Sequence, residues 1–202
     1  MKGIFRSVPI LVALVLAFPV TVAIDVRGAS AADDAGHTTF RYLVGAGFTE
    51  LGQVCDLGIP CPDGAMASNR DTIEISGEGT LRGPESVSGG GSFLHKNSAG
   101  HVLHVGTWTA KQLLSFESRG PGAGTPPTWE GGRALVLVRL VADEGGLEAN
   151  AILEVGCELP GNPPGIIEGV RLKVVNGLNF NQAFEPRATL FINLGAAEGK
   201  DD

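Results

Sequence analysis

Hydrophobic and polar residues alternate along the segment 147–158, and this alternation constrains the fold more than any other feature of the sequence. One set of alternate positions is apolar throughout and ends at Cys157, whereas the positions between them are charged or polar apart from Ile152 and Gly156. A period of two residues is typical of a β-strand with one buried and one solvated face. The same period recurs in 170–174 and, less strictly, in 134–142. These segments predict strands of an antiparallel sheet.

Short strands separated by turn residues account for most of the chain after residue 37. Turn signals lie at 97–100, 143–146 and 176–177, and no segment keeps a period of 3.6 residues over three helical turns. We therefore predict an all-β fold, a single antiparallel β-barrel or β-sandwich of about nine or ten strands. The expected strands, some of which merge to give that number, are 38–44, 48–54, 71–76, 78–82, 87–96, 101–109, 111–118, 133–142, 147–158, 168–175 and 188–194.

Glycine occurs within the expected strands as well as between them. The segment 76–81 (SGEGTL) is similar to the segment 88–93 (SGGGSF). Glycine inside a strand marks a bulge, a bend or the close approach of another backbone, and strong bending favours a closed or nearly closed barrel. In strand number and internal glycine the chain resembles calycin and dirigent-like barrels. No shared motif carries this resemblance, so it implies an architecture and no site residues.

The first 31 residues are predicted to be a signal peptide. Two basic residues precede an apolar run at 8–24, and a small-x-small cleavage site ends at Ala31. An uncleaved membrane anchor is the alternative, although the run is short for a span and contains two prolines. We expect residues 32–202 to form a single all-β domain with frayed ends at about 32–37 and 195–202, in a secreted or periplasmic protein.

The charge balance excludes some partners. The chain has 22 acidic and 15 basic residues and a net charge of −7, with no cluster of cations that could neutralise a phosphate backbone. We therefore expect no nucleic-acid partner and, because no later segment could span a bilayer, no membrane association after signal cleavage. No nucleotide-binding loop, zinc-protease motif or nucleophile elbow is present, so the sequence names no cofactor and no catalytic residue. It leaves the oligomeric state open.

Three cysteines allow one disulfide. Cys55 and Cys61 bracket a short segment, and we favour a bond between them, with Cys157 buried as a small hydrophobic residue. A bond from this segment to Cys157 is the alternative, because it would close a longer loop and restrict the unfolded chain more. A zinc site is less favoured, because the spacing of the first two cysteines is not that of a zinc-ligand pair.

His95 and His104 form the candidate metal site. If residues 98–99 form the tip of a hairpin, His95 faces Val102, and His104 lies diagonally opposite on the same face of the sheet. Diagonal neighbours lie roughly 7–8 Å apart at the backbone, close enough for two imidazoles to share a metal ion. Asp71, Glu74 and His37 are candidate third ligands. The alternative is that both are structural histidines on an apolar face of the core, hydrogen-bonded to the backbone.

Trp129 and Arg139 are the candidate ligand-binding residues. Trp129 lies in the proline- and glycine-rich segment 119–132, which is longer than an ordinary strand connection, and an exposed tryptophan there could stack on a ligand. Packing of Trp129 against the sheet is the alternative. Arg139 has apolar neighbours within its strand and could meet a carboxylate inside a barrel, or it could extend its stem over the outer surface.

These features favour an exported, non-catalytic β-domain that binds a small apolar or carbohydrate ligand. The first alternative is an enzyme, metal-dependent or cofactor-free, that uses His95 and His104. The second is a structural or interaction protein of the cell exterior, whose loops are only connectors. A cavity in the structure would support ligand binding, and convergent polar groups around the histidines would support catalysis.

Overall fold

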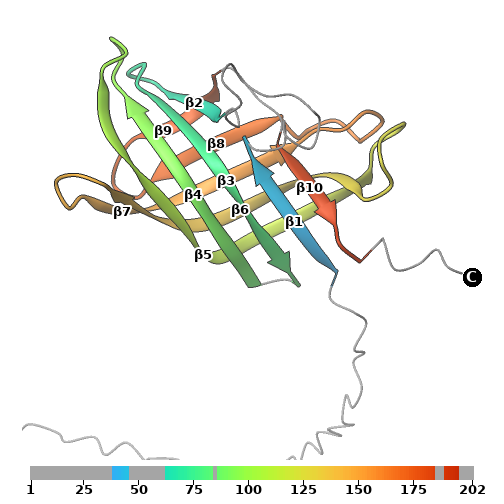
Figure 1. Ribbon diagram of the computed structural model, residues 1–202. Coiled ribbons are helices and arrows are strands. Elements are labelled where there is room, and N and C mark those ends of the chain that lie inside the picture. Colours follow the sequence, from blue (N-terminus) through green and yellow to red (C-terminus); the bar gives the residue numbers. More distant parts are fainter. Residues whose placement is uncertain (1–37, 46–61, 84–85, 185–188, 196–202) are drawn as a thin grey trace, which may run out of the picture. The chain divides into compact units, whose positions relative to one another are not determined.

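β-Strands make up all the regular structure that can be described. The computed structural model describes residues 38–45, 62–83, 86–184 and 189–195 (Figure 1). In these ranges the chain forms ten strands, and no helix there could cross a membrane. The strands are β1 (Thr39–Val44), β2 (Asp63–Ala67), β3 (Thr72–Arg82), β4 (Ser86–Lys96), β5 (Val102–Pro121), β6 (Trp129–Ala142), β7 (Glu148–Cys157), β8 (Gly169–Val174), β9 (Asn179–Ala183) and β10 (Leu190–Asn193).

All ten strands belong to one antiparallel sheet, in the order β1-β10-β6-β5-β4-β3-β2-β9-β8-β7. The predicted all-β class and antiparallel pairing are confirmed. Two strands have two successive neighbours along one edge. β3 pairs with β2 over Thr72–Ile75 and with β1 over Gly77–Arg82. β6 pairs with β10 at Trp129–Glu130 and with β7 over Gly132–Val141. The strand order begins with β1 and ends with β7, and each of these two strands also pairs with an internal strand, β1 with β3 and β7 with β6.

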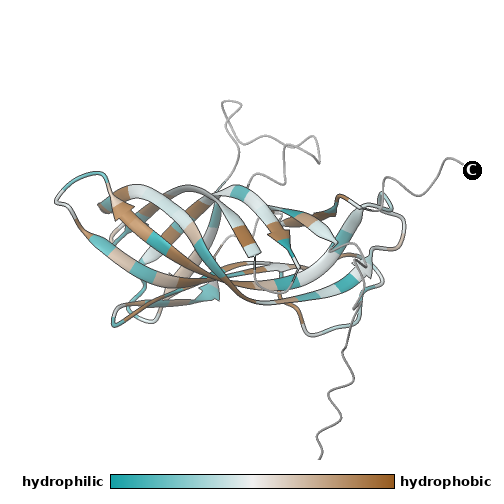
Figure 2. Ribbon diagram, turned by 90° about the horizontal axis from the view of Figure 1, so that it is seen from below, coloured by the Kyte–Doolittle hydropathy of each residue, from teal (hydrophilic) through white to brown (hydrophobic). Residues whose placement is uncertain are grey.

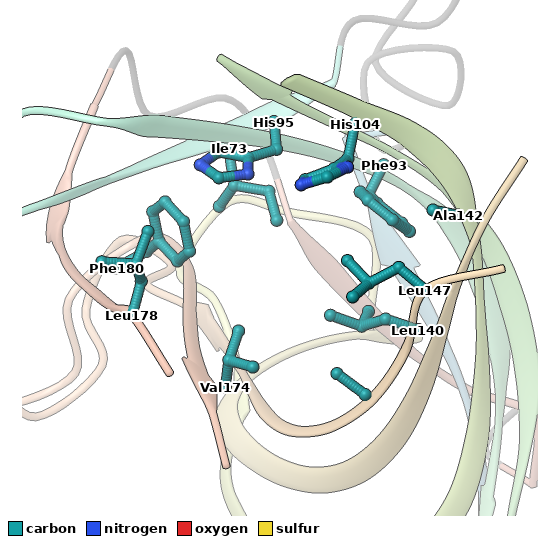
Figure 3. A pocket seen from close by; sticks show the side chains of 11 residues that line it. Ile73, Phe93, His95, His104, Leu140, Ala142, Leu147, Val174, Leu178 and Phe180 are labelled. Atoms are coloured by element: carbon teal, nitrogen blue, oxygen red, sulfur yellow. The ribbon is translucent and has the colours of Figure 1, made fainter. Parts of the chain in front are cut away.

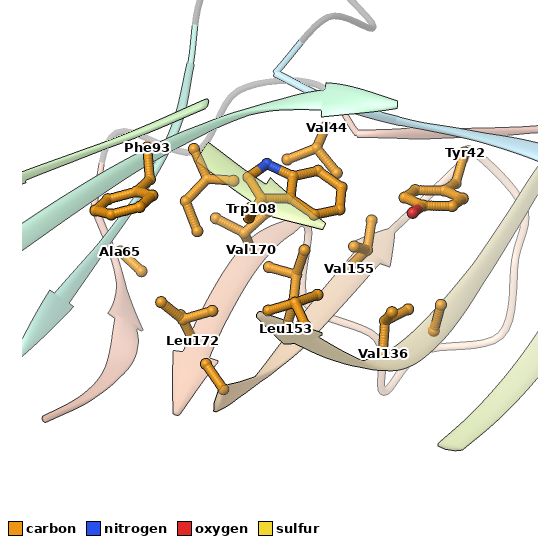
Figure 4. Packing of buried hydrophobic residues seen from close by; sticks show 14 of the residues in the cluster. Tyr42, Val44, Ala65, Phe93, Trp108, Val136, Leu153, Val155, Val170 and Leu172 are labelled. Atoms are coloured by element: carbon orange, nitrogen blue, oxygen red, sulfur yellow. The ribbon is translucent and has the colours of Figure 1, made fainter. Parts of the chain in front are cut away.

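The predicted alternation appears as alternating burial in β7. Leu153 and Val155 are buried, whereas Glu148 is exposed and Glu154 between the two buried residues is only partly buried. Figure 2 shows hydrophilic and hydrophobic residues following one another along the strands. The inward side chains form one core cluster, in which Trp108 packs close to residues of β7 and β8 (Figure 4). Burial of this apolar surface is the main force that holds the sheet together.

The two glycine-rich segments of the sequence are partners across one hairpin. Gly77 pairs with Gly91, and Gly79 pairs with Gly89, in the register of β3 and β4. A Cβ atom on Gly79 would lie 2.0 Å from the carbonyl oxygen of Ser88, and one on Gly91 would lie 1.9 Å from that of Ser76. The backbones of β3 and β4 therefore approach each other more closely than a residue with a Cβ atom would allow, as expected for glycine inside bent strands.

Strand boundaries differ from the prediction in the middle of the sheet. The segments 71–76 and 78–82 are one strand, β3, because Gly77 adopts a φ of 149° without interrupting the pairing with β4. The segments 101–109 and 111–118 are also one strand, β5. Register shifts near 110–112 and 113–115 keep β5 paired with β6 along its length. These bulges let one long strand bend without ending.

The strands β2 and β9 have no counterpart among the predicted strands. β2 has the sequence DGAMA and β9 has the sequence NFNQA, and neither contains β-branched residues or a regular apolar alternation. The predicted strand at 48–54 and the predicted signal peptide lie outside the described residues. So do the predicted frayed ends, except residue 195.

Candidate functional site

The curved sheet holds a pocket with a volume of about 170 Å³ (Figure 3). It lies close to the turn of the β4–β5 hairpin. One wall comes from the consecutive strands β3, β4 and β5, which contribute Ile73, Phe93, His95 and His104. Phe93 and His95 lie two residues apart on β4, so the pleat of the strand directs both to the same face. The pairing of β4 with β5 then places His104 beside His95.

The rest of the pocket is apolar. The strands β6 to β9 and their turns contribute only aliphatic and aromatic side chains, so within the described part of the chain the two imidazoles are the only polar side chains that line the pocket. Figure 3 shows Val174 across the pocket from the two histidines. These lining residues are Leu140, Ala142, Leu147, Ala149, Val174, Leu178 and Phe180.

The two histidines are closer than the predicted hairpin register would place them. His95 pairs directly with His104, and the ring centroids lie 5.6 Å apart with 32° between the ring planes. Lys96 pairs with Val102, so Leu103 is an extra residue on β5 and forms a bulge. The sequence correctly places both histidines on one face, whereas the predicted diagonal relationship is wrong because of this bulge.

Asp71 lies behind His95, in the turn between β2 and β3. Its Oδ2 atom lies 3.4 Å from Nε2 of His95, and its Oδ1 atom accepts a hydrogen bond of 3.1 Å from the backbone N–H of Ser98. The rings of Phe180 and His95 form a T-shaped contact with a centroid distance of 5.4 Å. The Asp71 carboxylate therefore joins the β2–β3 turn to the β4–β5 turn and orients His95 from outside the pocket.

Burial lowers the pKa of His95, since water would stabilise the charged imidazolium better than the apolar pocket does. Asp71 opposes this shift through its hydrogen bond and its charge, and repulsion from His104 adds to the lowering. The net effect favours the neutral imidazole. A neutral histidine in an apolar pocket is suited to hydrogen bonding with a bound molecule.

The described residues do not complete the predicted metal site. Among them, no group of three or more His, Cys, Asp or Glu side chains is placed to hold a metal ion. Of the candidate third ligands, Asp71 contacts His95, Glu74 is paired with Lys96 at 2.5 Å, and His37 lies outside the described residues. Metal binding by His95 and His104 stays a prediction.

Trp129 and Arg139 do not line the pocket. Trp129 is the first residue of β6, pairs with Ile192 and packs, partly buried, against the core cluster. The irregular connection is shorter than predicted, because β5 extends to Pro121 and leaves only 122–128 between the two strands. Arg139 is exposed on β6 and forms an ion pair with Glu148. These positions favour the alternatives of a packed tryptophan and a surface arginine.

Cys157 is a buried free thiol at the end of β7. Burial, together with the nearby charge of Glu168, raises its pKa to about 12. The favoured disulfide between Cys55 and Cys61 lies outside the described residues and stays a prediction.

Exposed apolar side chains of β5 lie beside the pocket, which the sequence did not reveal. Val102, Leu103 and Val105 are 54%, 45% and 46% exposed, and all three line a second hollow of about 350 Å³. This hollow shares His104 and Ala142 with the pocket, so the two adjoin. Large exposed apolar residues grouped together mark a surface that another molecule contacts.

Comparison with protein-family models, with curated proteins and with solved structures finds no match for this chain. The function must therefore be inferred from the pocket itself.

Proposed function

We propose that this protein is an exported β-barrel domain that binds a small apolar ligand in the pocket beside His95 and His104. The composition of the pocket wall carries the proposal, since every lining side chain that the structure describes, except the two imidazoles, is apolar. A carbohydrate needs many hydrogen-bond partners, whereas an apolar ligand gains free energy by leaving water for such a surface. The apolar wall therefore favours the apolar ligand over the carbohydrate.

The strand pairings support a barrel around this pocket. The pairings lead from β3 through β4, β5, β6, β7, β8, β9 and β2 back to β3, which is a circuit of eight strands. Seven of these strands, all but β2, contribute side chains to the pocket. Barrels of about eight strands have an interior just wide enough for packed side chains or one small ligand.

The size of the pocket limits the ligand. Its volume of about 170 Å³ is close to that of an engineered apolar cavity of about 150 Å³ that binds benzene. A molecule the size of a single aromatic ring therefore fits within the pocket. The exposed apolar residues Val102, Leu103 and Val105 provide a surface along which such a ligand could approach.

Toluene is a suitable probe, with its affinity measured by calorimetry on the purified protein. Ala149 lines the pocket, and the next residue along β7, Asn150, is exposed and does not line it. We expect saturable binding of toluene with a Kd below about 1 mM, which corresponds to about −4 kcal/mol. Ala149→Phe should weaken this binding at least tenfold by filling the pocket, and Asn150→Phe should leave it unchanged. No saturable binding, or equal binding by both variants, would contradict the proposal.

The assignment to the cell exterior depends on the N-terminal 31 residues. Intact-mass measurement of the protein recovered after export should give a chain that begins at Ala32. A mass that includes the first 31 residues would instead support the membrane-anchor alternative.

A further inference from the structure

Nδ1 of His95 is a hydrogen-bonding group that the pocket offers to a ligand, next to the imidazole of His104. Nε2 of His95 contacts a carboxylate oxygen of Asp71, and a carboxylate can only accept a hydrogen bond. Nε2 therefore carries the hydrogen of the neutral ring, which leaves Nδ1 as an acceptor. No described residue donates a hydrogen bond to Nδ1.

The surroundings favour an uncharged donor as its partner. Among the described residues, no lysine, arginine or carboxylate lines the pocket, and the ring plane of His95 is held by the Asp71 contact and by the T-shaped contact with Phe180. A ligand carboxylate would find no cation there and would be repelled by the nearby charge of Asp71. A hydroxyl group can donate to Nδ1 without either cost.

We propose that the ligand is an uncharged apolar molecule that carries one hydroxyl group and donates it to Nδ1 of His95. Figure 3 shows the two imidazoles side by side on one wall, with apolar side chains around the rest of the pocket. This arrangement places the polar end of the ligand at β4 and β5 and its apolar body against β6 to β9. The proposal rests on the function proposed above and adds the chemical class of the ligand.

Phenol, toluene and benzoate test the proposal, because they have nearly the same size and differ in one group. At about pH 7.5, where the unperturbed imidazole is neutral, we expect phenol to bind about three- to tenfold more tightly than toluene, the gain of one neutral hydrogen bond. Benzoate should bind most weakly. If toluene binds in the pocket but phenol binds no more tightly, this inference fails and the proposed function stands. If neither binds, both fail.

Two variants test whether His95 is responsible. His95→Phe removes the acceptor, so the ratio of phenol to toluene affinity should fall to about one. Asp71→Asn keeps an oxygen for the N–H of Ser98 and turns an amide N–H toward Nε2 of His95, which moves the ring hydrogen to Nδ1. Phenol can still bind this variant through its oxygen, because a hydroxyl accepts as well as donates. Anisole, whose oxygen only accepts, is therefore the informative probe: it should bind no more tightly than toluene to the unmodified protein and more tightly than toluene to Asp71→Asn. A preference for phenol that survives His95→Phe, or no gain for anisole in Asp71→Asn, would overturn the assignment to Nδ1, and far-UV dichroism of each variant verifies that the sheet is intact.

Discussion

Trp108 on β5 donates its indole N–H to the backbone carbonyl of Ser76 on β3, at 3.0 Å, although β4 lies between these strands. Trp108 pairs with Gly91 of β4, which has no side chain to fill the space. A Cβ atom on Gly77 of β3 would lie 2.8 Å from the indole ring. The facing glycines therefore let the largest buried side chain of the core reach across the sheet and satisfy its one polar group.

Gly91→Ala should destabilise the fold. The new Cβ atom would lie 1.9 Å from the carbonyl oxygen of Ser76, which is backbone and cannot rotate away. We expect the free energy of unfolding to fall by at least about 1–3 kcal/mol, measured by denaturant titration. Gly195→Ala is the matched control, because the nearest atom to its Cβ is 3.6 Å away. Equal stability of the two variants would contradict the close approach at Gly91.

Cys157 should react slowly with thiol reagents while the protein is folded. The thiolate is the reactive form, and burial raises the pKa of this thiol to about 12. At about pH 8, iodoacetamide should label Cys157 only after unfolding in guanidinium chloride, as read from the mass of its peptide. Cysteine introduced at the exposed turn residue Ala99 (Ala99→Cys) should be labelled without denaturant. Similar native labelling of both positions would contradict the buried state of Cys157.

Arg139→Ala should change the free energy of unfolding little. The side chains of Arg139 and Glu148 are 45% and 50% exposed, and exposed ion pairs contribute at most about 1 kcal/mol. Toluene affinity should also be unchanged, because Arg139 does not line the pocket. Arg171→Ala is a useful comparison. The Arg171 side chain is only 15% exposed and pairs with Glu154 at 3.4 Å. Its removal should therefore lower the free energy of unfolding more than Arg139→Ala does, because packing of the side-chain stem is also lost. An Arg139 variant that loses ligand affinity would restore the role predicted from the sequence.

The sequence predicts those strands in which burial alternates strictly. β7 and β8 carry this period, and their boundaries lie within two residues of the predicted segments 147–158 and 168–175. β2 and β9 have small or polar residues instead, and they become strands because each pairs with the other and with a neighbour in the sheet. The pairing of β2 with β9 joins residues far apart in the sequence and leaves no local signal.

The candidate site could be predicted only where the hairpin is local. His95 and His104 are near in sequence, so the turn between them predicts that they share a face of the sheet. The bulge at Leu103, which brings them directly opposite each other, could not be predicted from the turn. Val174 and Phe180 complete the pocket from strands far along the chain. The period of two in 170–174 indicates that Val174 faces inward, but nothing local indicates that it faces the histidines.

His95 should make the stability of the fold depend on pH. Burial lowers its pKa below the ordinary value of 6.5, against the opposing effect of Asp71. The charged or titratable groups that face it are Asp71 from the β2–β3 turn and His104 from β5, while the neighbouring Lys96 is paired with Glu74. The unfolded chain therefore binds a proton at this residue more readily than the folded protein does. Its contribution is fully present above about pH 6.5 and is lost as the pH falls toward the folded pKa.

His95→Gln isolates this effect, because glutamine keeps a polar side chain and does not titrate. The free energy of unfolding of each protein should be measured by denaturant titration at about pH 7.5 and about pH 5.5, on either side of the unperturbed histidine pKa. On acidification the unmodified protein should lose stability relative to the variant, since only its unfolded state gains from protonation at residue 95. If the unmodified protein instead gains stability relative to the variant, the contact with Asp71 outweighs burial, and the folded protein favours the imidazolium.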